Sequence, residues 1–145
     1  MVYLDTSFVA PYYLNEATSS AVSKTLQRFN PGQLVLSSWT RTEFASLLAR
    51  LVRMKELPYT LALEVMRTFE EDMRVSFVVA EPVKTDFAYA SSLLLQDPSL
   101  GLRSPDALHL AVAANRSLTV YTLDKTLVRA ANALGYSASS AGILP

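Results

Sequence analysis

The stretch Val2-Tyr3-Leu4-Asp5-Thr6-Ser7, residues 2–7, introduces the pattern that the rest of the chain follows. It begins with a short β-prone apolar run and continues with residue types that cap helices. A mostly apolar segment follows Ser7, so the stretch predicts a strand, a turn and a helix in that order. The carboxyl end of this strand therefore carries an acid, Asp5.

Further strand-to-helix units are predicted along the chain. Their strands cover residues 33–36, 75–80 and 118–122, and the helices that follow begin near residues 39, 83 and 125. Additional helices are predicted over residues 18–29, 58–74 and 107–115, and the tail over 136–145 is expected to add an edge strand. Such alternation favours right-handed crossovers. The predicted fold class is α/β, a three-layer α/β/α domain with a mainly parallel sheet of four to five strands.

Two segments carry more detailed predictions. Residues 75–80 form an apolar run interrupted only by Ser76, which is typical of a strand buried on both faces of a parallel sheet. Ser104-Pro105-Asp106 is typical of a helix start, with the serine as N-cap, proline at the first helical position and an acid in the first turn. The helix over 107–115 is apolar nearly all round and is expected to be central.

The composition is typical of one globular domain over residues 1–145. At 145 residues and 50% hydrophobic content, the chain is long enough to bury one core. Its 13 Lys and Arg balance 13 Asp and Glu, so a polyanionic partner would be held by local charge or by a metal ion. The lack of Cys excludes disulfides, thiolate metal sites and a cysteine nucleophile.

The sequence carries no sign of a signal peptide or a membrane span. Its first residues lack a basic region, and Asp5 interrupts what would be an apolar signal core. No uncharged apolar run of about 18 residues follows. We therefore expect a soluble, cytoplasmic protein without membrane contact.

Certain acids lie where the predicted topology would bring them together: Asp5, Glu43, Asp106 and Asp124. In open α/β sheets the functional crevice lies beyond the carboxyl ends of the strands. Carboxylates gathered there would raise one another's pKa values unless a cation lay among them, and hard oxygen donors suit Mg²⁺ or Mn²⁺. Such an ion can lower the pKa of a bound water and neutralise charge on a phosphodiester.

Each acid also has a purely structural explanation that the sequence leaves open. Asp124 could be only an N-cap, and Asp5 could be only a turn former. Asp106 could serve only the helix dipole, and Glu43 could be surface charge. The positions of these acids at strand-to-helix junctions and helix starts favour the functional interpretation.

The acids lie within short motifs that follow one another in order: Leu4-Asp5-Thr6-Ser7, Thr40-Arg41-Thr42-Glu43-Phe44, Asp106-Ala107-Leu108-His109-Leu110-Ala111 and Thr122-Leu123-Asp124. Their order and spacing resemble a PIN domain, most closely the VapC type of toxin from bacterial and archaeal toxin–antitoxin systems. The resemblance spans about residues 2–135, almost the whole chain. No single motif is specific by itself.

The resemblance implies a metal-dependent endoribonuclease acting on single-stranded or looped RNA, with Mg²⁺ as the ion and Mn²⁺ as a substitute. It implies Asp5, Glu43, Asp106 and Asp124 as the catalytic acids. Asp5 and Asp106 would be direct metal ligands, Glu43 and Asp124 would reach the ion through water, and Ser7 and Thr122 would support them. A cognate antitoxin would occlude the site. The toxin would form a homodimer, to which we expect the helices over residues 39–74 to contribute apolar surface.

Other polar residues near these motifs have two interpretations each. Arg41, Arg103 and Lys125 could hold RNA phosphates, or they could be ordinary solvated charge. His109, the only histidine, lies one turn after Asp106 on an apolar helix. We favour a structural role for it, because metal-activated water requires no histidine as a base.

Two other function classes fit an α/β domain of this size. A noncatalytic signalling or interaction module of the receiver type would carry paired acids after its first strand, whereas Asp5 stands alone before Thr6 and Ser7. A metal-dependent DNA nuclease would use long DNA-gripping elements, for which this chain has little room. Phosphorylation of an aspartate and digestion of DNA, respectively, would favour these alternatives.

Overall fold

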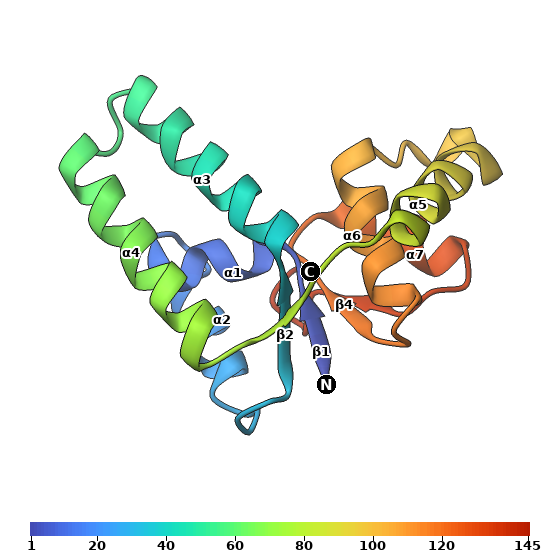
Figure 1. Ribbon diagram of the computed structural model, residues 1–145, viewed down its shortest axis with the longest axis horizontal. Helices are drawn as coiled ribbons and strands as arrows, with labels where there is room; N and C mark the ends of the chain where they lie inside the picture. The colour runs from blue at the N-terminus through green and yellow to red at the C-terminus, as the bar shows by residue number, and fades with distance from the viewer.

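The computed structural model describes all 145 residues as one five-stranded sheet with helices on both sides (Figure 1). The strands are β1 (Val2–Leu4), β2 (Leu34–Ser37), β3 (Val78–Ala80), β4 (Thr119–Tyr121) and β5 (Ala138–Ser139). All neighbouring strands pair in parallel, in the order β3-β2-β1-β4-β5. The parallel α/β architecture predicted from the sequence is therefore confirmed.

Helices connect the strands in the predicted alternation. They are α1 (Thr6–Tyr13), α2 (Ser19–Leu26), α3 (Ser38–Arg53), α4 (Tyr59–Val75), α5 (Lys84–Gln96), α6 (Ser104–Ala114) and α7 (Lys125–Ala133), with a short 3₁₀ turn, η1 (Pro98–Leu100), before α6. α3 and α4 form a long hairpin that projects from one side of the sheet (Figure 1). No helix has both the length and the apolar character needed to cross a membrane.

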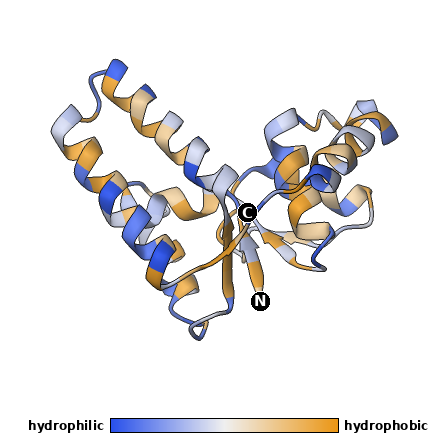
Figure 2. Cartoon of the chain, viewed as in Figure 1, coloured by the Kyte–Doolittle hydropathy of each residue, from blue (hydrophilic) through white to orange (hydrophobic).

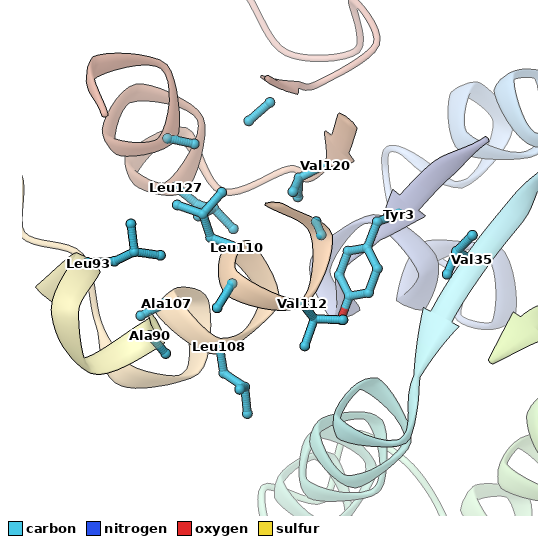
Figure 3. Close-up of a cluster of buried hydrophobic side chains, with 14 residues drawn as sticks. Tyr3, Val35, Ala90, Leu93, Ala107, Leu108, Leu110, Val112, Val120 and Leu127 are labelled. Carbon is cyan, nitrogen blue, oxygen red and sulfur yellow. The ribbon is translucent and has the colours of Figure 1, made fainter. Parts of the chain in front are cut away.

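Two buried clusters fill the two sides of the sheet, because successive strand residues point to opposite faces. Tyr3 and Val120 belong to the cluster beneath α5, α6 and α7 (Figure 3). Leu4 belongs to the other cluster, where the rings of Phe44 and Phe69 pack with centroids 4.5 Å apart. Figure 2 shows hydrophobic residues along the strands and alternating hydrophobic and hydrophilic residues on α4. The three layers are thus held by two separate cores.

Helix α6 is central, as its apolar sequence predicts. Every residue from 107 to 113 is buried. The prediction that Ser104 is the N-cap was wrong: Arg103 occupies the cap position with an extended backbone, and Ser104 is the first helical residue. Pro105 fits within the first turn because the first backbone N–H groups of a helix need no intrahelical partner.

Strand β3 differs most from its prediction. The expected strand over residues 75–80, buried on both faces, was wrong, because Val75 is the last residue of α4 and the strand covers only 78–80. β3 pairs with β2 alone at the edge of the sheet, and Val78 and Val79 remain 39% and 37% exposed. An apolar run predicts a strand, but its burial depends on the position of the strand in the sheet.

The end of the chain follows its prediction. Gly135 adopts a left-handed backbone (φ 86°) after α7, which ends the helix in the way that glycine allows. The tail then adds the short edge strand β5 beside β4. The connections run from β1 outward through β2 to β3, and the chain then returns to place β4 on the other side of β1. The carboxyl ends of β1 and β4 therefore flank the point where the strand order reverses, which is the place where α/β sheets bind ligands.

Candidate active site

A pocket of about 400 Å³ opens at the carboxyl ends of β1 and β4. Its walls come from the starts of α1 and α6, one face of α3 and the turn before α7. The lining residues are Asp5, Thr6, Ser7, Glu43, Ser46, Leu47, Arg50, Arg103, Asp106, His109 and Asp124. The acids singled out in the sequence all line it, and Leu47 is its one hydrophobic residue.

Asp5 is the most enclosed of these acids, at 3% exposed. It caps α1 by accepting a hydrogen bond from the backbone N–H of Phe8 at 2.9 Å. The Ser7 hydroxyl donates to its Oδ1 at 2.8 Å, and the Thr122 hydroxyl donates to its Oδ2 at 2.6 Å. The structure thus places Ser7 and Thr122, both expected as supporting residues, directly on the Asp5 carboxylate.

The same two hydroxyls connect Asp5 to the turn after β4. The Leu123 N–H donates to Ser7 Oγ at 2.9 Å, and the Asp124 N–H donates to Thr122 Oγ1 at 3.0 Å. Burial raises the pKa of Asp5, against the lowering effects of His109 and of the hydrogen bonds from Thr122, Ser7 and Phe8. The hydrogen bonds therefore hold the Asp5 carboxylate in place, but together with His109 they do not fully offset the cost of burying its negative charge.

Glu43 reaches the pocket from α3, about one turn after β2. The Thr6 hydroxyl donates to its Oε1 at 2.7 Å, and Nε2 of His109 contacts the same oxygen. Burial acts to raise the pKa of Glu43, but the hydrogen bond and charge of His109 outweigh it, so that the pKa lies below its usual value. Glu43 is thus a carboxylate at neutral pH, bound on one oxygen.

Asp106 and Asp124 share one cation. Arg103 donates from Nε to Asp106 Oδ2 and from Nη2 to Asp124 Oδ2, each at 3.1 Å. Burial raises the pKa of Asp106; Arg103 counteracts this effect, whereas the charge of Asp124 adds to it. Arg103 therefore supplies positive charge between two acids that would otherwise repel each other.

The structural and functional interpretations of the acids turn out to be compatible. Asp124 is the N-cap of α7, accepting from the N–H groups of Thr126 and Leu127 through Oδ1, and it presents Oδ2 to Arg103 at the pocket. Asp5 likewise caps α1 while it lines the pocket. Because a carboxylate has two oxygens, one can cap a helix while the other remains available to the site.

Of the three basic residues that the sequence offered as RNA contacts, only one lies at the pocket. Arg103 lines the pocket, but Arg41 is paired with Glu70 of α4 outside it, and Lys125 is exposed and does not line it. Arg50 was missed and lines the pocket from α3. Glu43, Ser46, Leu47 and Arg50 are spaced as one helix face, so the period of 3.6 residues could have identified Arg50 once Glu43 was placed.

The donor set fits a hard divalent cation. All four acids offer carboxylate oxygens, the ligands that Mg²⁺ and Mn²⁺ prefer. Burial leaves Asp5 and Asp106 with raised pKa values, so positive charge at this place would stabilise their ionised forms. In the present conformation no group of three His, Asp or Glu side chains lies close enough to hold one ion. Arg103 and His109 contact the carboxylate oxygens of Asp124 and Glu43 instead.

The PIN domain family matches residues 2–133 of this chain. No curated protein matches it. Among solved structures, VapC20 of Mycobacterium tuberculosis, described as a sarcin–ricin loop cleaving toxin, is 18% identical with a TM-score of 0.72. The alignment covers 94% of this chain and 96% of that one.

Two further solved structures are similar to this chain. VapBC2 of Rickettsia felis, bound to a DNA fragment from its promoter, is 15% identical with a TM-score of 0.67 and covers 96% and 98% of the two chains. FitAcB of Neisseria gonorrhoeae is 20% identical with a TM-score of 0.65 and covers 95% and 96%. At these identities the likeness establishes the shared fold.

Proposed function

This chain belongs to the PIN domain family, and on that premise we propose that it is a metal-dependent endoribonuclease, the toxin of a toxin–antitoxin pair. The observation that carries the proposal is the convergence of Asp5, Glu43, Asp106 and Asp124 on one pocket at the carboxyl edge of the sheet. Capping alone explains Asp5 and Asp124 but gives no reason for Glu43 and Asp106 to line the same pocket.

We assign Asp5 and Asp106 as direct ligands of Mg²⁺, for which Mn²⁺ can substitute, with Glu43 and Asp124 acting through water. The ion, when bound, lowers the pKa of its water and offsets charge on the phosphate. Ser7 and Thr122 keep Asp5 from rotating, since they bind both of its oxygens. Arg103 is well placed to exchange its carboxylate partners for an RNA phosphate, because its side chain is 69% exposed.

RNA as substrate is supported by the description of VapC20 as a sarcin–ricin loop cleaving toxin. An antitoxin partner is supported by a toxin–antitoxin complex from Klebsiella pneumoniae, which is 15% identical to this chain with a TM-score of 0.64. A homodimer built on the α3–α4 hairpin remains a proposal. An apolar hollow of about 310 Å³ between these helices offers surface for a protein partner. Light scattering after size-exclusion chromatography that detects only monomer would contradict the dimer.

The ribonuclease proposal predicts cleavage of RNA that depends on a divalent ion. Protein purified without antitoxin should cut RNA with Mg²⁺ or Mn²⁺, lose this activity in EDTA, and regain it when the ion is restored in excess. Gel electrophoresis of a labelled structured RNA measures the cleavage, and a DNA of the same sequence is digested in parallel for comparison. Absence of RNA cleavage with both ions would refute the proposal. Cleavage of DNA alone would indicate a DNA nuclease, and phosphorylation of an aspartate by a small phosphodonor without cleavage would indicate a signalling module.

The placement of Arg50 predicts a role in holding the RNA backbone. Arg50→Ala should raise KM for RNA about fivefold, leave kcat nearly unchanged and reduce the salt dependence of binding by about one charge, as expected for one lost phosphate contact. Arg53→Ala is the matched control, because Arg53 lies one turn further along α3 and lines the apolar hollow between α3 and α4 instead. Equal effects of the two variants would show that only general charge matters.

A further inference from the structure

A chain of buried hydrogen bonds leads from the core of the sheet to Glu43. Tyr3 on β1 is fully buried, and its ring reaches toward α6 (Figure 3). The Tyr3 hydroxyl donates to Ser37 Oγ at 2.8 Å and lies 2.7 Å from Nδ1 of His109. Nε2 of His109 in turn contacts Oε1 of Glu43. Three elements that are far apart in sequence, β1, α6 and α3, are therefore joined at one carboxylate.

The direction of these hydrogen bonds follows from the groups involved. The Tyr3 hydroxyl has one proton, which it gives to Ser37, so its oxygen accepts from Nδ1–H of His109. Glu43, as a carboxylate, can only accept, so Nε2–H of His109 donates to it. Both ring nitrogens of His109 therefore donate hydrogen bonds within the protein. His109, at 1% exposed, has no free nitrogen with which to act as a base.

The contacts of Glu43 are one-sided. Thr6 and His109 both donate to Oε1, and no hydrogen bond within the protein uses Oε2. Because Oε1 is held from two directions, rotation of the carboxyl group is restricted. Glu43 itself lines the pocket, and Oε2 is the oxygen left for a ligand there.

We propose that Tyr3 and His109 are positioning residues that hold Glu43 through Oε1 so that Oε2 is presented to a reacting water in the pocket. This inference rests on the proposed ribonuclease activity. Thr6 restrains the same oxygen from the start of α1, and Ser37 fixes the Tyr3 hydroxyl from the end of β2. The sequence singled out neither Tyr3 nor Thr6, and it left His109 with a general structural role.

A double-mutant cycle between Tyr3 and Glu43 tests this proposal. Tyr3→Phe should lower kcat for RNA cleavage about tenfold with little change in KM. Such a loss is typical when a residue that orients a group of the site through hydrogen bonds is removed. In a Glu43→Gln background, adding Tyr3→Phe should change the rate less than twofold, because there is no carboxylate left to position. Equal losses in the two backgrounds would overturn the proposal.

Tyr13→Phe is the matched control for loss of a hydroxyl. Tyr13 packs against Phe44 and Phe69 in the other core and donates to Asp72 at 2.8 Å, and neither Tyr13 nor Asp72 lines the pocket. It should lower the unfolding temperature by an amount similar to Tyr3→Phe while kcat per folded molecule stays at the parent value. A tenfold loss of kcat in this control would mean that removal of a tyrosine hydroxyl from either core lowers the rate, and that the contact with Glu43 does not explain the effect of Tyr3→Phe.

A spectroscopic measurement tests the geometry without relying on cleavage. Because His109 is the only histidine, ¹⁵N-labelling of histidine gives one imidazole spin system. Its Nε2 resonance should shift in Glu43→Gln and its Nδ1 resonance in Tyr3→Phe. An unchanged Nε2 resonance in Glu43→Gln would overturn the proposal even if RNA is cleaved. Failure of the parent protein to cleave RNA would instead refute the ribonuclease assignment.

Discussion

Asp5→Asn should abolish RNA cleavage, with a loss of about a thousandfold or more, and should leave the metal-free protein as stable as its parent. Removing a direct ligand of a catalytic ion forfeits several kcal/mol of transition-state stabilisation, at about 1.4 kcal/mol for each factor of ten. Burial raises the pKa of Asp5, so the folded metal-free protein holds the ionised form less favourably than the unfolded chain does. A neutral isostere avoids that cost. Single-turnover cleavage and thermal unfolding in EDTA measure the two effects.

Asp86→Asn provides the control for Asp5→Asn. Asp86 is also a buried carboxylate, but its surroundings lower its pKa, whereas those of Asp5 raise it. It accepts from the Val83 N–H, Asn115 and Arg116, and these partners outweigh burial and lower its pKa. Its ionised form therefore stabilises the fold above the ordinary pKa of an aspartate, and this contribution disappears as the pH falls through the lowered value.

The Asp86→Asn variant should lose about 2–3 kcal/mol of stability at pH 7, because it leaves Arg116 without its ionic partner. Its cleavage rate per folded molecule should stay at the parent value. If Asp5→Asn instead kept the parent cleavage rate, as is expected here of Asp86→Asn, the charge of Asp5 would have no part in the reaction and Asp5 would be only a helix cap. Urea unfolding at pH 7 and at pH 3.5 distinguishes the two variants, since the deficit of Asp86→Asn should shrink at the lower pH.

The fold and the acids were predictable from sequence because both depend on local patterns. Strand-to-helix junctions follow from apolar runs next to capping residues, and parallel pairing then brings the acids of β1 and β4 to one edge. Asp5 and Asp124 were recognised for this reason. The same capping pattern also made their structural and functional interpretations look like alternatives. In the structure, Asp124 caps α7 through Oδ1 while Oδ2 contacts Arg103 at the pocket, so the two interpretations are compatible.

The features that escaped prediction depend on contacts between distant segments. Nothing near Tyr3 in the sequence shows that its hydroxyl meets His109, 106 residues away. The exposure of β3 depends on its place at the edge of the sheet, which an apolar run does not encode. Arg41 lies within the Glu43 motif, two residues before Glu43, yet it projects from another side of α3 and pairs with Glu70. Proximity along a helix is a poor guide to a shared face, and the period of 3.6 residues is a better one.

Asp124→Asn should lower the cleavage rate about 10- to 100-fold and change stability by less than about 0.5 kcal/mol. Asparagine is as good an N-cap as aspartate, so the Oδ1 bonds to Thr126 and Leu127 can persist. The negative charge at Oδ2, which Arg103 now contacts, is lost, and residues that support a metal site through water typically contribute to this extent. Parallel measurement of kcat/KM and of urea unfolding separates the charge from the cap.

Asp97→Asn is the appropriate comparison for Asp124→Asn, because Asp97 caps η1 by accepting from Ser99 N–H at 3.0 Å and lies outside the pocket lining. It should leave both rate and stability close to those of the parent. If Asp124→Asn behaved in the same way, Asp124 would be a cap alone, and Asp5, Glu43 and Asp106 would form the whole acidic set. A loss of cleavage with an intact cap would instead show that the carboxylate charge at the start of α7 acts on the reaction.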